Sequence, residues 1–218
     1  MTSKSSASQS IEFIHFNLGL IDAHLLRALY DEEMKENLTI AKRYLDVLKR
    51  AGIIVGITAW ETYIEDKIKS QFEKNIEQAV SPKDIQSAFN SVAEEWLSAK
   101  PKPPDLATWA SEGWKVLIRE KFTKDIESLN TPSSEHIRKL TKRYLNLDLT
   151  QKWRWPGVTY EEACRKLDSL IKLRGGIVHR GRSIAEKKRI ITKRQLLASL
   201  GLIQRLAVCT ENALKAKV

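Results

Sequence analysis

Apolar residues recur every three or four positions along most of the chain, with polar residues filling the positions between them. This spacing places apolar side chains on one face of an α-helix, whereas a half-buried strand would alternate from residue to residue. No stretch alternates for long, and glycine is sparse, with 9 in 218 residues. The pattern therefore predicts an all-α fold, a helical bundle of about six helices.

Capping residues and prolines set the expected helix boundaries. Asn37 is the expected N-cap of the second helix, and Ser81-Pro82 is a good helix start. Thr159 with Glu162, and Thr192 with Gln195, fit the capping-box pattern. The expected helices cover residues 11–33, 37–79, 81–100, 106–129 or 110–129, 133–145, the stretch from 159 onward, and 192–215.

The second expected helix carries a long apolar stripe with two glycines inside it. Gly52 and Gly56 indicate either close helix packing or a bend, and the sequence leaves both open. The stripe consists of Ile53, Ile57, Trp60, Ile64 and Ile68.

The chain length and the positions of its polar and proline-rich segments predict one domain. Residues 1–10 (MTSKSSASQS) form a polar tail, and residues 11–218 are long enough for one sizeable core. The "KPKPPD" segment at residues 100–105 is a stiff connector, which we interpret as a loop within that domain because the helices on either side need each other for burial.

Composition narrows the setting. Two isolated cysteines, Cys164 and Cys209, form no disulfide framework, and the start of the chain lacks the apolar region of a secretory signal, so we expect a cytoplasmic protein. No apolar run approaches the length of a membrane span. The four histidines have no paired spacing, so we expect neither a bound metal nor another cofactor.

Positive charge is concentrated at the C-terminal end. The chain carries a net charge of +10, and from Arg174 onward eleven basic residues face two acidic ones, a net charge of +9 for that segment. Such a field suits a polyanion, with nucleic acid ahead of a membrane surface. A solvated basic surface remains an equal alternative.

Two tryptophans bracket a cation in the loop "QKWRWPG". Trp153 and Trp155 on either side of Arg154 can stack on nucleic-acid bases. Tryptophans in such loops more often cover the ends of core helices, so the role of this loop stays open.

An arginine interrupts the apolar face of the helix that begins at Thr159. Arg174 falls near the middle of that face, where it must extend along its apolar stem, find a buried carboxylate, or lie at a subunit interface around an anion. The apolar residues of the face are Ala163, Leu167, Leu170, Ile171, Ile177 and Val178.

His179 follows five positions after Arg174. An unbroken helix would turn it about 140° away and raise it about 7.5 Å. A site shared by the two side chains therefore requires either a local break, which Gly175 and Gly176 permit, or a second chain across a two-fold axis.

The segment "LDSLIKLRGGIVHRG" resembles the arginine–histidine motif of HEPN-fold proteins. Upstream, "AWETYIEDKI" and "TPSSEHIRKLTKRYLNLDL", followed by the two loop tryptophans, resemble the RiboL-PSP-HEPN branch, and the resemblance covers residues 49–181. It implies a HEPN-like bundle and a homodimeric, metal-independent endoribonuclease. Arg174 and His179 then inherit catalytic roles. Cleavage would proceed by attack of the RNA 2′-OH and leave a 2′,3′-cyclic phosphate.

The same resemblance implies supporting residues and a biological setting. Glu61 would orient Arg174 or His179, although an ordinary surface carboxylate is an equal reading. Independently of the resemblance, Arg180 and Arg182 follow the motif and either contact RNA phosphates or are solvated loop arginines, two equal readings. Lys187, Lys188 and Arg189 are further candidates for phosphate contact, although such a cluster is more often a solvated surface. The family suggests a toxin-antitoxin, antiviral defence or RNA-processing role, with a cognate antitoxin or regulatory protein as a further partner.

One departure from the family pattern opens an alternative. The position after the motif arginine is often a polar residue, commonly asparagine, and here it is Gly175. The alternative is a catalytically silent HEPN-type module that binds RNA or a protein. A DNA-binding regulator is a weaker option, because no helix-turn-helix spacing is present and the last helix is too apolar to lie in a groove.

Overall fold

The computed structural model describes residues 9–35, 42–98, 106–129, 132–180 and 191–215. Within these ranges the chain forms seven α-helices and three short 3-10 helices, and its β-type pairing is one bridge between Trp155 and Val158. The predicted all-α class is confirmed, with seven helices where about six were expected. The elements in chain order are α1 (Ile11–Lys35), α2 (Lys42–Gln78), η1 (Pro82–Ile85), α3 (Gln86–Ser98), η2 (Leu106–Trp109), α4 (Gly113–Glu127), α5 (Ser134–Leu145), η3 (Leu149–Lys152), α6 (Tyr160–Arg180) and α7 (Lys193–Lys215).

The caps expected at Thr192 and Thr159 are present. Thr192 Oγ1 accepts a hydrogen bond from Gln195 N–H at 3.1 Å, and Gln195 Oε1 accepts one from Thr192 N–H at 2.9 Å, which completes the capping box of α7. Thr159 Oγ1 accepts from Glu162 N–H at 3.3 Å before α6. Asn37 and the "KPKPPD" connector lie outside the described residues.

The helix expected from Ser81 begins with a tighter turn. Pro82 starts the 3-10 helix η1, and regular α-helix follows only from Gln86. The Asp84 carboxylate accepts hydrogen bonds from the backbone N–H groups of Ser81 and Val80, at 2.8 and 3.0 Å, and so satisfies donors at this start.

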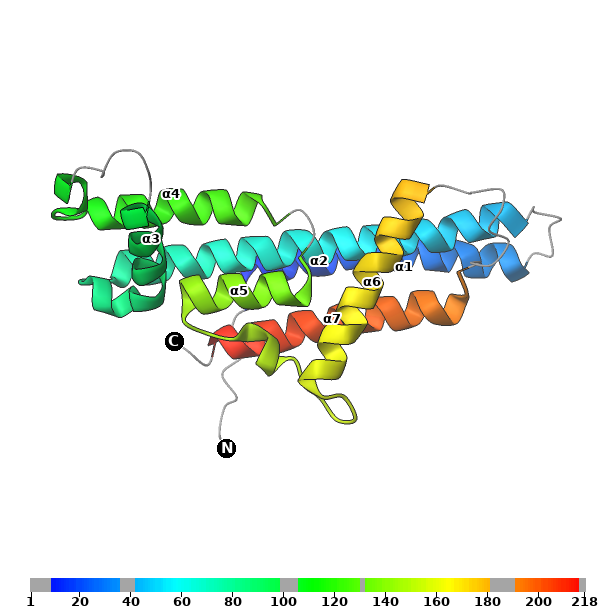
Figure 1. The fold of residues 1–218 in the computed structure, drawn as a ribbon. Coiled ribbons are helices and arrows are strands. Elements are labelled where there is room, and N and C mark those ends of the chain that lie inside the picture. The colour runs from blue at the N-terminus through cyan, green and yellow to red at the C-terminus, as the bar shows by residue number, and fades with distance from the viewer. Residues whose placement is uncertain (1–8, 36–41, 99–105, 130–131, 181–190, 216–218) are drawn as a thin grey trace, which may run out of the picture. The chain divides into compact units, whose positions relative to one another are not determined.

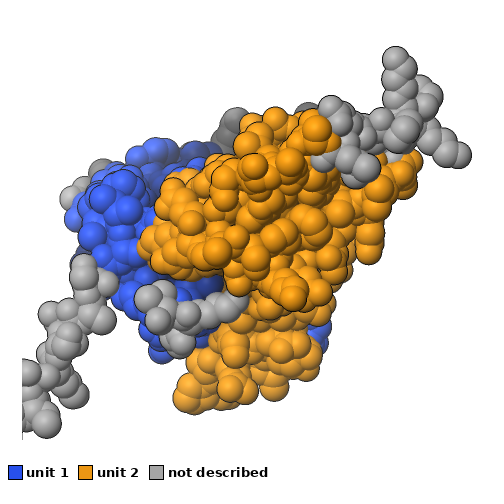
Figure 2. Space-filling view, turned by 90° about the vertical axis from the view of Figure 1, so that its left-hand side faces the viewer, with its two compact units in different colours: residues 1–63, 165–218 blue, residues 64–164 orange. Residues whose placement is uncertain are grey.

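The chain divides into two compact units, coloured separately in Figure 2. Unit 1 contains Met1–Tyr63 and Arg165–Val218, and unit 2 contains Ile64–Cys164. Helices α2 and α6 each contribute residues to both units. The single domain expected for residues 11–218 stays a prediction.

Close contact between helices holds unit 1 together. A Cβ added at Gly56 would lie 2.6 Å from Leu200 Cδ2 of α7, and one at Gly52 would lie 3.1 Å from Leu196 Cδ1 of the same helix. On the α1 side, a Cβ at Gly19 would lie 2.9 Å from Ala59 Cβ. The two glycines of α2 therefore serve close packing, which settles the choice left open by the sequence.

A buried carboxylate connects three segments of unit 1. Glu211 of α7 accepts hydrogen bonds from the Tyr63 hydroxyl of α2 at 3.2 Å and from Ser10 Oγ at 2.7 Å. Ser10 Oγ in turn accepts from Phe13 N–H at the start of α1. Burial, followed by the charge of Glu211, raises the pKa of Tyr63, so the phenol stays a donor to this carboxylate.

Unit 2 has its own aromatic core and polar network. Phe72 of α2 stacks on Phe122 of α4 with ring centroids 3.9 Å apart, and Tyr144 of α5 meets both rings edge-on. The Tyr144 hydroxyl donates to Asp125 at 2.7 Å, and Arg143 Nη1 lies 2.6 Å from the same carboxylate. The network joins α4 to α5 at the edge of the core.

The longest described helices are not membrane-like. Across the described ranges, no helix combines the length and the apolar character that a membrane span requires.

Candidate functional site

Helix α6 runs without interruption through the two glycines. It is α-helical from Tyr160 to Arg180, so the local break considered as one route to a shared site is absent. The flanking side chains supply enough packing to keep the glycines helical, since Leu167, Leu170 and Ile171 are buried. An added Cβ at Gly175 or Gly176 would meet no described atom within 4 Å.

Arg174 pairs with Glu61 of α2. Arg174 Nη2 lies 3.2 Å from Glu61 Oε2, and both residues belong to unit 1. The Glu61 side chain is only 11% exposed and that of Arg174 is 30% exposed. Of the three environments considered for this arginine, the structure shows contact with a buried carboxylate. Glu61 is thus not an ordinary surface carboxylate.

The neighbouring core fixes the position of Glu61. Trp60, directly before it, is fully buried, and Tyr63 two residues later contacts the rings of Phe13 and Phe16. With those side chains locked into the core, the backbone of α2 has a fixed rotation, and Glu61 is directed toward α6. The carboxylate therefore holds one end of the guanidinium in place.

The apolar face of α6 does not stay buried to its end. Ile177 is partly exposed and Val178 is 52% exposed, so the predicted apolar face is open to solvent in its last turn. An apolar surface thus lies immediately beyond the Arg174–Glu61 pair.

His179 belongs to α6, but its side chain lies outside the described residues, as does that of Arg180. Arg182, Lys187, Lys188 and Arg189 lie outside the described residues altogether. In the continuous helix, the Cα positions of Arg174 and His179 differ by about 140° around the axis and about 7.5 Å along it. The structure thus brings Arg174 and Glu61 together and leaves the other predicted site residues untested.

The described residues offer few other candidate sites. They contain no group of three or more His, Cys, Asp and Glu side chains placed to bind a metal ion. Cys164 is buried, consistent with a packing role. In the tryptophan loop, Trp153 is fully buried as the core interpretation predicts, while Trp155 is partly exposed and lines a surface hollow that the sequence did not indicate.

The all-α fold, with Arg174 near the C-terminal end of α6 and a carboxylate of α2 beside it, defines a HEPN-type module. The family model described as RiboL-PSP-HEPN matches residues 22–216, which is most of the chain and covers all of unit 2 and most of unit 1. The chain belongs to the RiboL-PSP-HEPN family. No curated protein matches it, and no solved structure does.

Proposed function

We propose that this HEPN-type module is a metal-independent endoribonuclease that acts as a homodimer. Arg174 and His179 are the proposed catalytic residues, and Glu61 is a positioning residue for Arg174. The observation that carries the proposal is the Arg174–Glu61 pair, because it fixes the motif arginine next to the segment that holds the histidine. Family membership adds the expected reaction class.

The chemistry needs only groups that the motif and the RNA supply. His179 removes the proton of the 2′-OH, the 2′-oxygen attacks the adjacent phosphorus, and the bond from phosphorus to the 5′-oxygen breaks. The protonated His179 imidazole then returns a proton to the departing 5′-oxygen, so the products are a 2′,3′-cyclic phosphate and a 5′-OH. Its ordinary pKa of about 6.5 suits both transfers at neutral pH. Arg174 stabilises the charge that builds on the phosphate oxygens.

The geometry of α6 supports the proposed dimer. Since the helix is unbroken, Arg174 and His179 of one chain diverge, and we propose that Arg174 acts with His179 of the partner protomer. Two features support an interface here. Val178 is exposed beside the pair, and the open space at Gly175 and Gly176 allows a second helix or an RNA backbone to approach closely.

Substrate binding and setting belong to the same proposal. Five basic residues that follow the motif supply cations for RNA phosphates: Arg180, Arg182, Lys187, Lys188 and Arg189. Contacts to phosphates do not select an RNA sequence. We propose a cytoplasmic toxin-like or RNA-processing role in which a cognate antitoxin or regulatory protein controls activity.

The test is RNA cleavage in EDTA. Purified protein should cut single-stranded RNA and leave 2′,3′-cyclic phosphate ends, and RNA carrying 2′-O-methyl groups should resist. His179→Ala should lower the rate by about 10²- to 10⁴-fold while the melting temperature stays unchanged. Equal cleavage by the wild-type protein and the variant would contradict the proposal, since the activity would then come from elsewhere.

The second candidate function is a catalytically silent module that binds RNA or a protein partner. Gly175 favours it, because a side chain that is often polar in the family is missing beside the arginine. RNA binding by both the wild-type protein and His179→Ala, with no cleavage by either, would support this candidate. Gly175→Asn then tests whether the missing amide is the reason.

A further inference from the structure

The loop before α6 contains a rigid turn that presents Trp155. Trp155 N–H donates to Val158 O at 3.2 Å, and Val158 N–H donates to Trp155 O at 2.9 Å. Between them, Pro156 takes the second position of the turn and Gly157 has φ = 80°, the arrangement of a type II β-turn. Two hydrogen bonds and a proline hold the loop in one shape.

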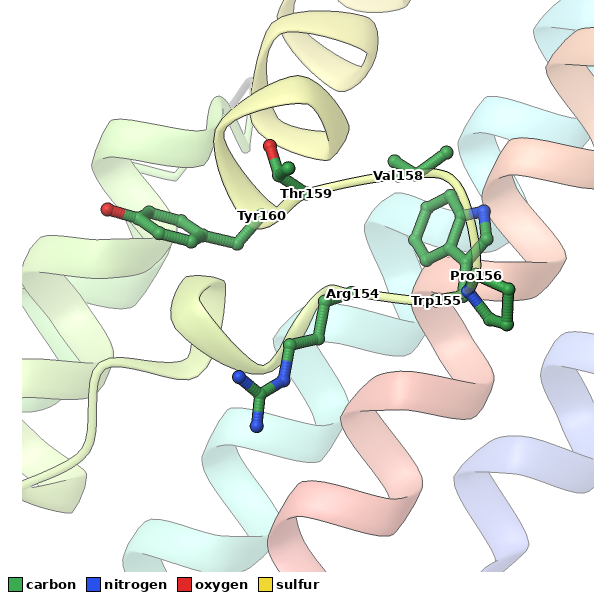
Figure 3. Close-up of a pocket in the computed structure, with 6 residues that line it drawn as sticks. All are labelled: Arg154, Trp155, Pro156, Val158, Thr159 and Tyr160. Atoms are coloured by element: carbon green, nitrogen blue, oxygen red, sulfur yellow. The ribbon is translucent and has the colours of Figure 1, made fainter.

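The same loop and the start of α6 enclose a surface hollow of about 420 Å³. Figure 3 shows Trp155 and Tyr160 on opposite sides of it, with the Arg154 side chain below them in the view and its guanidinium pointing away from both rings. Pro156, Val158 and Thr159 complete the lining. The volume falls within the range of small-molecule sites, about 300–1,000 Å³.

The composition of the lining selects a planar anion. Its two aromatic rings offer flat apolar faces, Arg154 is an exposed cation, and no lining residue is acidic. The hollow also adjoins the N-terminus of the 21-residue helix α6, where the helix dipole is positive and the first turn carries the carboxylates of Glu161 and Glu162. A nucleotide combines a flat base with a negative phosphate and matches both properties.

Burial shows that Trp155 differs from its neighbour. Trp153, two positions earlier, is fully buried and needed by the core, whereas Trp155 stays partly exposed on a rigid turn. A fixed, partly exposed aromatic ring loses little conformational freedom when a base stacks on it, which favours binding.

We propose that this hollow binds one base of a single-stranded RNA, with the base against Trp155 and a neighbouring phosphate at Arg154. The inference rests on the proposed function in taking RNA as the substrate, and it adds a binding subsite separate from the Arg174–Glu61 pair. Stacking reads no base edge, so the subsite tolerates different bases.

The experiment measures binding of adenosine 5′-monophosphate and of a short 2′-O-methyl RNA by calorimetry. Trp155→Ala removes one stacking contact, so its affinity for both ligands should be about tenfold lower than that of the wild-type protein. Trp155→Phe keeps an aromatic ring and should retain much of the wild-type affinity. Arg154→Gln should weaken binding of the RNA and reduce its salt dependence. Lys152→Gln, an exposed cation outside the lining, is the matched control.

Subsite and nuclease can fail separately. Cleavage with equal RNA affinity for the wild-type protein and Trp155→Ala would overturn the subsite and leave the proposed function standing. Loss of nucleotide affinity in Trp155→Ala, in a protein that cuts no RNA, would support the subsite and contradict the nuclease. An affinity for ribose 5-phosphate equal to that for adenosine 5′-monophosphate would overturn the subsite, because the base would then contribute nothing to binding.

A separate observation concerns the outer face of α1. Six large apolar side chains there are between 45% and 65% exposed, and five of them follow the three-four spacing of a coiled-coil seam. The opposite face of the helix is buried in unit 1 through Phe13, Phe16, Leu20 and Ala23. The exposed residues are Ile11, Ile14, Leu18, Ile21, Leu25 and Leu29, and we call them the α1 seam.

The α1 seam faces away from the Arg174 site. The residues of α2 that contact α1 include Gly56, Ala59 and Tyr63, and Glu61 lies about 180° around α2 from them. Any partner on the α1 seam therefore leaves the Arg174–Glu61 pair accessible.

The geometry points to a second copy of this chain as the occupant, with the two α1 helices antiparallel. A seam with this spacing fits another helix of the same spacing, and a two-fold axis supplies one. His15 and Asp22 are both exposed and lie on the same side of the α1 seam. In an antiparallel pair, His15 of each copy therefore lies near Asp22 of the other copy. The six side chains, each 45% to 65% exposed, supply an apolar strip along α1 that contributes to the roughly 800 Å² that each partner buries in a standard interface.

Sedimentation tests this second interface. The paired changes Leu18→Glu and Ile21→Glu should halve the mass of the assembly formed by the wild-type protein, with unchanged helicity because both positions are exposed. Val80→Glu, at a position that is 90% exposed in unit 2, is the matched control. A mass unaffected by the α1 changes would overturn the proposal.

Discussion

At the scale of single residues, the pairing of Arg174 with Glu61 is the central finding. An arginine on an apolar helix face has several possible environments, and only the tertiary structure shows which carboxylate lies beside it. The sequence could place Arg174 on that face from spacing alone. Spacing could not select Glu61, because the two residues lie far apart along the chain and on different helices; only the family resemblance named it, as one of two equal readings.

Glu61→Gln tests the positioning role. The amide keeps the shape of the side chain but loses the charge-assisted contact, so Arg174 becomes less well placed. We expect kcat for RNA cleavage to fall by about tenfold or more with little change in KM. Glu77→Gln, at an exposed position on α2, should leave kcat unchanged. An unchanged kcat for Glu61→Gln would show that the pair is only structural.

Substitution of Glu211 tests a carboxylate whose role is purely structural. It is buried and accepts hydrogen bonds from Tyr63 and Ser10, so Glu211→Ala leaves both donors unsatisfied. We expect the free energy of unfolding to fall by about 2–4 kcal/mol, measured with urea. A change below 0.5 kcal/mol would mean that water replaces the carboxylate at no cost, contrary to this account.

At the scale of helices, the glycines show what spacing can and cannot reveal. Gly52, Gly56, Gly175 and Gly176 look alike in the sequence, since each lies inside an apolar pattern. The first two contact α7 closely, and the last two face open space in a helix that stays continuous. Helix positions and caps were predictable from local patterns, but the partner of each glycine depends on packing.

Two glycine substitutions should have opposite effects on stability. Gly56→Ala forces a Cβ against Leu200 and should lower the free energy of unfolding by about 1–3 kcal/mol. Gly175→Ala meets no described atom and should raise it by up to about 1 kcal/mol through helix propensity. The same Gly175→Ala should slow RNA cleavage if a partner helix or RNA approaches there. Destabilisation by Gly175→Ala in urea unfolding would contradict the open environment.

At the scale of the whole molecule, the division into two units was not visible in the sequence. The proline-rich connector at residues 100–105 was the only linker candidate, whereas the boundaries fall at Tyr63 and Cys164, inside α2 and α6. Continuous helices carry no linker pattern, so composition gives no sign of such a boundary. The excess of basic residues from Arg174 onward could be counted in the sequence. Residues 181–190, which contain several of these cations, lie outside the described residues.

Acid stability should depend on the Asp125 network. Burial opposes ionisation of Asp125, but the hydrogen bonds from Tyr144, Lys121 and Arg143 outweigh it and hold its pKa below the ordinary value. The ionised group therefore stabilises the fold at neutral pH, and this contribution is lost as the pH falls below about 4. Asp125→Asn should lower the melting temperature at pH 7 and flatten its decline toward pH 3. Parallel curves for both proteins would contradict this.

The most direct test of the composite site is to mix two inactive variants. Arg174→Ala keeps His179, and His179→Ala keeps Arg174, so a mixed dimer restores one Arg174 opposite one His179. After exchange of protomers, the mixture should cut RNA in EDTA at up to roughly a quarter of the wild-type rate, since half of the dimers are mixed and each holds one of two pairs. A mixture that forms mixed dimers but cuts no faster than either variant alone would contradict the account.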